Sequence, residues 1–217
     1  MKAMKKIKII RGNVLMAIGM VLVMAAVGLT VYNIWDESRA ENELTQTLSE
    51  LDLLTESQST AGEILNIPMV SEIPDYVFNP EIEMPSLTLD RGVYIGVLEV
   101  PSLGLRLPVM KDWSYPNLKV SPCRYSGSVY LNNMVVAGHN YRSHFGGLSR
   151  VSVGDEVRFI DMDGNLFSYT VEETETVMPT DIEYMITGDW DLTLFTCTYG
   201  GRTRFTLRCS AQSINGI

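Results

Sequence analysis

Histidine, cysteine and basic residues are scarce in this sequence, and each shortage limits what the protein can do. Among 217 residues there are two histidines and three cysteines. Three cysteines are too few for a fold that depends on disulfides. The 17 basic residues are outnumbered by 26 acidic residues, which gives a net charge of −9. Phosphate binding needs a basic surface, so this charge excludes nucleic acid as a partner.

Acidic residues are missing altogether from the first 35 positions. Residues 1–13 form a basic tail, and the 19 residues of 14–32 carry no charge. As a helix, that uncharged segment spans about 28 Å, close to the hydrocarbon thickness of about 30 Å. We expect a single membrane-spanning anchor over 14–32, with the basic tail in the cytoplasm and the remainder outside. A cleaved signal peptide is the alternative, although its apolar core is usually shorter.

The next segment, 33–90, is expected to be an acidic stalk and linker. Positions 36–90 hold thirteen acidic residues and a single base. Leu44, Leu48 and Leu51 are spaced as on one face of a helix, which predicts a short amphipathic helix over about 37–57. That helix would be either a solvated stalk or a surface that pairs with a second copy. Four prolines then follow at intervals of five or six residues, which predicts an extended linker.

The remaining segment, 91–217, is predicted to be one all-β domain. Short strands alternate with turns, and no long helical pattern occurs. Many short strands are typical of a sandwich or a closed barrel. The clearest hairpin surrounds the sequence Asp-Met-Asp-Gly-Asn at 161–165. A calcium loop is the alternative there, but its glycine does not have the EF-hand spacing, so no metal site is predicted.

A cysteine and a histidine are the best candidates for a nucleophile and its acid–base partner. His139 and Cys197 each end a strand, where reactive groups often lie on a rigid scaffold. Arg204 begins the next strand and would return beside Cys197 if the two strands form a hairpin. A guanidinium there could stabilise an oxyanion. His144 and Arg202 are the rival residues, one in a loop and one in a turn.

These residues resemble the motifs of the sortase family of Gram-positive cell-surface transpeptidases. The matching segments are Ala-Gly-His at 137–139, Leu-Thr-Leu-Phe-Thr-Cys at 192–197 and Arg204. Framework segments 94–109 and 153–159 also look like that family. The resemblance implies an all-β, eight-stranded β-barrel with short helices, preceded by one transmembrane helix and a stalk. It leaves the subclass open between class B-like and class D-like.

The resemblance also implies a mechanism. Cys197 would attack the Thr–Gly bond of an LPxTG-like sorting signal at the C-terminus of a surface protein, forming a thioacyl enzyme. His139 would protonate the leaving amine, Arg204 would bind the carbonyl or its oxyanion, and Thr196 would add a hydrogen bond nearby. An amine of a cell-wall precursor or a pilin would then resolve the thioester. The resemblance implies no cofactor.

The region before the cysteine strand shapes the sorting-signal groove in that family. The resemblance therefore gives four candidate apolar contacts: Met178, Pro179, Ile182 and Met185.

Two other functions stay open: a cysteine hydrolase that releases surface proteins, and a non-catalytic surface binding module. Cys123 and Cys209 are expected to be free, half-buried thiols, and a disulfide between them is the alternative.

Overall fold

The computed structural model describes residues 2–64, 73–198 and 200–212, with side chains described from residue 14 and, in the first helix, up to residue 54. It divides into two compact units, Met1–Arg39 and Ala40–Ile217. Helix α1 (Lys2–Ile64) contains the predicted anchor segment. Within the described residues, it is the one helix that is long and apolar enough to cross a membrane. The apolar helix predicted over 14–32 is therefore present, as part of a longer helix.

The part of α1 that belongs to the second unit packs against the β domain. Ala40, Leu44, Thr47 and Leu51 are buried and follow one another at helical spacing. Leu44 joins the main apolar core, and Arg106 donates two hydrogen bonds to Asp52, of 2.8 and 2.9 Å. Residues 37–57 are helical, as predicted, but they belong to one continuous helix, Lys2–Ile64, and not to a separate short one. The solvated character is also wrong for this face, which covers the domain's own core.

The proline-containing segment is not entirely extended. Helix α2 (Asp75–Phe78) makes a single turn, and Tyr76 stacks on Tyr130 with ring centroids 4.4 Å apart. Strand β1 (Leu87–Leu89) then pairs with the start of the barrel. Pro68 lies outside the described residues. Aromatic stacking thus holds the turn against the domain, which a count of prolines did not predict.

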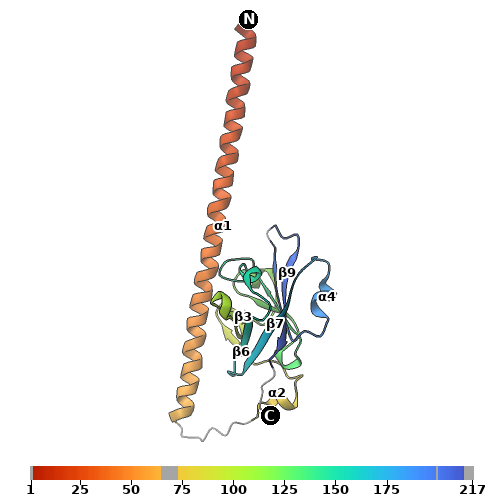
Figure 1. Cartoon of the computed structure of the whole chain (residues 1–217). Coiled ribbons are helices and arrows are strands. Elements are labelled where there is room, and N and C mark those ends of the chain that lie inside the picture. Colours follow the sequence, from red (N-terminus) through yellow and green to blue (C-terminus); the bar gives the residue numbers. More distant parts are fainter. Residues whose placement is uncertain (1, 65–72, 199, 213–217) are drawn as a thin grey trace. The chain divides into compact units, whose positions relative to one another are not determined.

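Eight strands close a β-barrel, as predicted, and Figure 1 shows them around the core. They are β2 (Gly92–Val100), β3 (Leu105–Met110), β4 (Cys123–Ser126), β5 (Met134–Gly138), β6 (Glu156–Asp161), β7 (Leu166–Val177), β8 (Leu192–Cys197) and β9 (Arg204–Ala211). The order is β2-β3-β4-β5-β8-β9-β7-β6, and the pairing of β2 with β6 closes the barrel. Strand β1 adds to the edge of β2. Short helices connect the strands: α3 (Tyr115–Leu118), α4 (Ile182–Ile186), η1 (Pro101–Leu103), η2 (Val129–Leu131) and η3 (Leu148–Arg150).

The predicted hairpin between β6 and β7 is confirmed. Its turn is organised by Asp161, whose carboxylate accepts hydrogen bonds from the backbone N–H groups of Asp163 and Asn165. The same carboxylate accepts a 2.7 Å hydrogen bond from the hydroxyl of Tyr130. Gly164 has a φ of 83°, a conformation that other residues rarely adopt. The Asp161 carboxylate oxygens thus accept hydrogen bonds from the turn backbone and from Tyr130.

Alternation along the strands separates two apolar clusters. The larger cluster fills the barrel and includes Met134, Val136, Leu192, Leu194 and Leu207. The smaller cluster includes Val135, Ala137 and Phe195, which alternate with those residues and therefore lie on the outer face. The outer face of the β5–β8–β9 sheet carries these side chains: Val135, Ala137, Thr193, Phe195, Cys197, Arg204, Thr206 and Arg208. This outer face holds the candidate site.

Candidate active site

Strand register brings the three predicted catalytic residues to one end of the outer face. Cys197 pairs directly with Arg204 in the antiparallel β8–β9 ladder. Strands β5 and β8 are parallel, and their last pair is Gly138 with Thr196. The next residues along the chain are His139, which directly follows β5, and Cys197, the last residue of β8. The three side chains therefore lie in one row across β5, β8 and β9, and each is half-buried.

The loop that follows β5 holds His139 in place by packing. The His139 ring stacks on Tyr141, with centroids 3.8 Å apart and planes 15° from parallel. The backbone carbonyl of His139 accepts a 3.1 Å hydrogen bond from the N–H of Phe145. A Cβ atom at Gly138 would lie 2.2 Å from the Phe145 ring, so only glycine fits before His139. This explains the glycine at the last position of β5.

The rival histidine, His144, lies in the loop as predicted, but it is fully buried there. Its ring meets Tyr141 edge-on, with centroids 5.3 Å apart. Burial, with a smaller contribution from the charge of His139, lowers the pKa of His144 to about 3. A buried neutral imidazole cannot reach a substrate, which leaves His139 as the accessible histidine.

The β8–β9 turn distinguishes Arg204 from Arg202. Arg202 is exposed in the turn, whereas Arg204 is half-buried opposite Cys197. The Nη1 atom of Arg204 donates to the carbonyl oxygens of Gly201 and Thr203, each at 3.2 Å. Gly201 has a φ of 69°, and this left-handed conformation lets the turn close tightly. The short spacing between the cysteine and the arginine is what returns Arg204 to the level of Cys197.

All three cysteines are free thiols, as expected, but two are fully rather than half buried. Burial raises the pKa of Cys123 and of Cys209 to about 12. Cys197 is half-buried at the strand end. Only Cys197 therefore combines access with neighbours suited to nucleophilic catalysis.

Thr196 lies on the other side of the sheet from Cys197. Because successive residues of a strand point to opposite faces, its side chain enters the barrel, where it is buried. Among the described residues its hydroxyl has no hydrogen-bond partner. A substrate on the outer face would therefore not meet this hydroxyl.

The four groove candidates divide into two groups. Met185, on α4, is buried in the outer cluster together with Ala137 and Phe195. Met178 and Ile182 are exposed, and Pro179 is half-buried. The structure thus packs Met185 into the outer apolar cluster and leaves the other three outside it and accessible.

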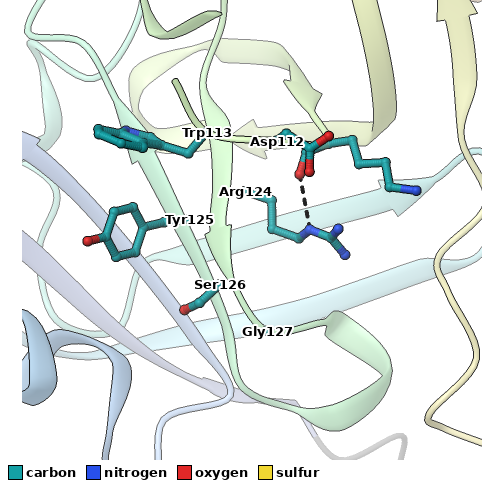
Figure 2. A pocket seen from close by; sticks show the side chains of 7 residues that line it. Asp112, Trp113, Arg124, Tyr125, Ser126 and Gly127 are labelled. Carbon is teal, nitrogen blue, oxygen red and sulfur yellow. Dashed lines mark hydrogen bonds between the residues drawn. The ribbon is translucent and has the colours of Figure 1, made fainter. Parts of the chain in front are cut away.

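An aromatic row on the outer face was not predicted from the sequence. The ring of Phe195 meets Tyr125 edge-on at 5.4 Å, and Tyr125 meets Trp113 edge-on at 5.6 Å. Figure 2 shows Trp113 and Tyr125 on one side of β4 and Arg124 on the other, around an open pocket of about 460 Å³. Phe195 lies two residues before Cys197 and so shares its face, which was a usable signal. Tyr125 and Trp113 join it only through the pairing of β3, β4 and β5.

The fold and the site define a closed β-barrel with an accessible thiol between an imidazole and a guanidinium. The family model of the Sortase domain matches residues 98–212, just over half of the chain, and the chain belongs to the sortase family. Sortase A of Listeria monocytogenes is 30% identical over 130 residues, covering 54% of this chain and 58% of that protein. Sortase A of Bacillus anthracis is 25% identical over 177 residues, covering 79% of each chain. The crystal structure of the Listeria monocytogenes sortase A superposes with a TM-score of 0.50 at 26% identity, covering 55% of this chain and 88% of that one.

The comparisons cover the β domain of this chain and only part of the relatives' length. This chain spans less than two thirds of the Listeria protein's length in that match. The match to the family model begins within β2 and ends just after β9, so it includes all three residues of the row on the outer face. Family membership therefore rests on the part of the chain that carries His139, Cys197 and Arg204.

Proposed function

We propose that this protein is a membrane-anchored cysteine transpeptidase that cleaves an LPxTG-like sorting signal between Thr and Gly. The observation that carries the proposal is the row of His139, Cys197 and Arg204, in which Cys197 is the accessible thiol. Membership of the sortase family, whose members are cell-wall transpeptidases, supports the same reaction. The new carboxyl group would be joined to an amine of a cell-wall precursor or a pilin.

In the first step, the Cys197 thiolate attacks the carbonyl carbon of the threonine in the sorting signal. The C–S bond forms, and the carbonyl oxygen becomes an oxyanion that the guanidinium of Arg204 stabilises. The intermediate collapses by breaking the Thr–Gly C–N bond. The His139 imidazolium gives its proton to the leaving glycine amine, and a thioacyl enzyme remains.

In the second step, the acceptor amine attacks the thioester. Neutral His139 takes a proton from the amine as the new C–N bond forms. The C–S bond then breaks, Cys197 leaves as the thiolate, and the imidazolium is restored. Both steps need the same three side chains, which is why one row on one face is sufficient for the cycle.

The sorting signal would lie on the outer face beside Cys197. Ala137, Phe195 and Met185 form a buried apolar layer beneath this face and support it. Met178, Pro179 and Ile182 are accessible and would supply apolar contacts to the signal's leucine and proline. Their exposure in the free protein agrees with a surface that a peptide covers on binding.

The N-terminal segment would hold the enzyme at the cell surface. The apolar part of α1 is long enough to span a membrane, and the basic tail before it favours a cytoplasmic N-terminus. The barrel would then lie outside the cell, where surface proteins with C-terminal sorting signals and an amine acceptor are present.

The test uses the full chain in detergent micelles with LPxTG-like peptides and triglycine, and mass spectrometry of the products. The expected product is the peptide joined to triglycine, absent with Cys197→Ala. Cleaved peptide without the adduct would favour a hydrolase in which water resolves the thioester. Neither product, together with a Cys197 that does not react with iodoacetamide, would contradict the enzyme and favour a binding module.

A further inference from the structure

A buried arginine lies on the same face as the catalytic row. Arg208 is 1% exposed and is the largest fully buried side chain among the described residues. It lies two residues after Thr206 and four after Arg204 on β9, so all three side chains point to the outer face. A buried guanidinium is costly unless its donors are satisfied by partners. The hydrogen-bond partners of Arg208 therefore show which elements this side chain connects.

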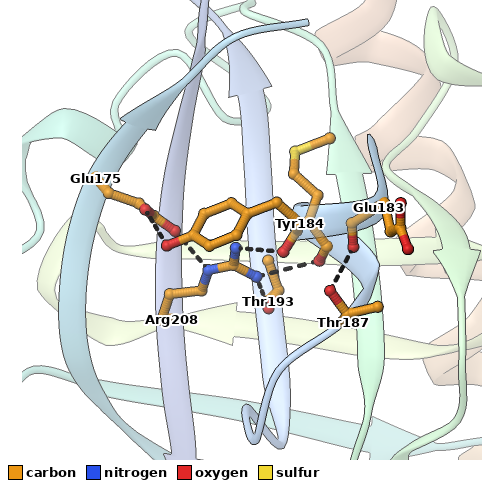
Figure 3. Close-up of polar contacts among 7 residues, drawn as sticks. Glu175, Glu183, Tyr184, Thr187, Thr193 and Arg208 are labelled. Carbon is orange, nitrogen blue, oxygen red and sulfur yellow. Dashed lines mark hydrogen bonds and ion pairs between the residues drawn. The ribbon is translucent and has the colours of Figure 1, made fainter. Parts of the chain in front are cut away.

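Arg208 connects three strands with α4, as Figure 3 shows. Its Nε atom donates to Oε1 of Glu175 on β7 at 2.7 Å, and its Nη1 atom donates to the Thr193 hydroxyl on β8 at 3.1 Å. The backbone carbonyls of Met185 and Tyr184 accept from Nη1 and Nη2, at 3.1 and 3.0 Å. The guanidinium thus binds the backbone of α4 to the barrel.

The side chain of Tyr184 completes this arrangement. Its hydroxyl donates to Oε2 of Glu175 at 3.0 Å, while Oε1 of the same carboxylate accepts from Arg208. The guanidinium carbon of Arg208 lies 5.1 Å from the centre of the Tyr184 ring, within cation–π range. Glu175 therefore bridges Arg208 and Tyr184, and each of the three side chains contacts the other two.

Helix α4 has little else to hold it. It is a single turn, Ile182–Ile186, and Met185 is its one buried side chain. Isolated turns of this length are unstable in water. The carbonyls of the last turn of a helix have no partner within the helix, and Arg208 satisfies two of them. Removing the guanidinium would therefore free α4, and Met185 with it, from the outer face.

We propose that Arg208 is a positioning residue that fixes α4, anchored by the buried Met185, so that the exposed side of α4 forms one wall of the peptide groove. The proposal rests on the proposed function, because it assumes that the peptide lies between α4 and Cys197. A groove wall that is already ordered in the free enzyme spares the peptide the cost of ordering it on binding. Arg208 thus acts on peptide affinity, while the thiol chemistry belongs to the row at the other end of the sheet.

The first part of the test measures α4 itself and does not need activity. Hydrogen exchange of the full chain would follow the amides of Met185 and Thr187, which bond to Asp181 and Glu183 within the α4 turn. In Arg208→Lys we expect their exchange to be about tenfold faster or more, and in Glu175→Gln to rise less. The matched control is Arg158→Lys, since Arg158 forms an exposed ion pair with Glu156 on β6. Unchanged exchange in a folded Arg208→Lys protein would overturn the proposal.

The second part measures KM and kcat with an LPxTG-like peptide and saturating triglycine. Arg208→Lys is expected to raise KM by about tenfold while kcat stays within about threefold, because only ground-state positioning is lost. The rate of Cys197 alkylation by iodoacetamide should not change. If Arg208→Lys fails to fold, Glu175→Gln and Tyr184→Phe are read in the same way. A fall in kcat and in the alkylation rate, with KM unchanged, would contradict the positioning role.

The two proposals fail in different ways. If the wild-type protein turns over no peptide, the proposed function fails, while the exchange measurement still shows whether Arg208 holds α4. If the wild type is active but KM does not respond to Arg208→Lys, the function stands and the positioning role is wrong.

Discussion

Cys197 and Arg204 are paired residues of one β-ladder, although six residues separate them in the chain. The pairing fixes their side chains side by side on the same face of the sheet. The spacing between the two residues is short because a tight turn that includes Gly201 connects β8 directly to β9. The relation predicts that Arg204 cannot be replaced by its neighbour in the turn.

Replacing Arg204 should therefore be far more harmful than replacing Arg202. We expect Arg204→Lys to lower kcat/KM by about 100-fold or more, because an ammonium cannot donate the guanidinium's fixed pair of hydrogen bonds to an oxyanion. Arg202→Lys is the matched control and should stay within about threefold of wild type, since Arg202 is exposed. The measurement is the rate of peptide–triglycine product formation. Equal losses in the two variants would contradict the assignment of Arg204.

The three cysteines should differ strongly in reactivity. Cys123 and Cys209 are buried, and the pKa of each is raised to about 12, so their thiolate fraction at pH 8 is about 10⁻⁴. Iodoacetamide should modify Cys197 about 100-fold faster or more in the native protein. Peptide mapping after timed alkylation measures this, and in denaturant the three rates should converge. Equal native rates would show that Cys197 has no special environment.

His144 should make the fold sensitive to acid. Its pKa is lowered to about 3 in the folded protein, below the value of about 6.5 expected for an unfolded chain. Stability from this group is therefore complete above pH 6.5 and falls as the pH drops towards 3, because the unfolded state binds the proton more readily. Between pH 7 and pH 5 the loss from this one group amounts to about 2 kcal/mol at most.

The measurement is urea unfolding of wild type and His144→Leu at both pH values. The variant should lose less stability on acidification than the wild type, since the other titrating groups are common to both. The same loss in both proteins would show that His144 does not carry the effect.

Leu44 should stabilise the β domain although it belongs to the long N-terminal helix. It is 4% exposed and joins the main core, so Leu44→Ala should lower the free energy of unfolding by about 2–3 kcal/mol. Leu53→Ala is the control on the same helix, because Leu53 is 69% exposed and should change stability by less than about 0.5 kcal/mol. Denaturant unfolding of the full chain in micelles compares them. Equal effects would contradict packing of this helix face on the barrel.

Much of the site could be predicted because strand ends and local register are visible in the sequence. The strand that ends at Cys197 and the one that begins at Arg204 are joined by a short turn, so a hairpin brings them together. The place of His139 depended on the pairing of β5 with β8, which are distant in the chain. Local pattern could not give that pairing, and the family resemblance supplied it.

The misses come from packing between distant segments. The burial of His144 depends on how its loop folds over Tyr141, and nothing in the local sequence requires it. The role of Arg208 could not be foreseen either, because its partners Glu175, Thr193 and Tyr184 come from three other elements. A charged residue in a strand is usually solvated, and only the tertiary structure shows that this one is enclosed.

The most direct test of the account is whether the substrate's acyl group becomes attached to Cys197. The full chain would be mixed with LPxTG-like peptides without an acceptor amine, quenched in acid, and analysed by intact mass and peptide mapping. We predict an adduct of the peptide up to its threonine on Cys197, absent in Cys197→Ala and discharged by triglycine. No adduct on Cys197 with any peptide, while the thiol still reacts with iodoacetamide, would contradict the account.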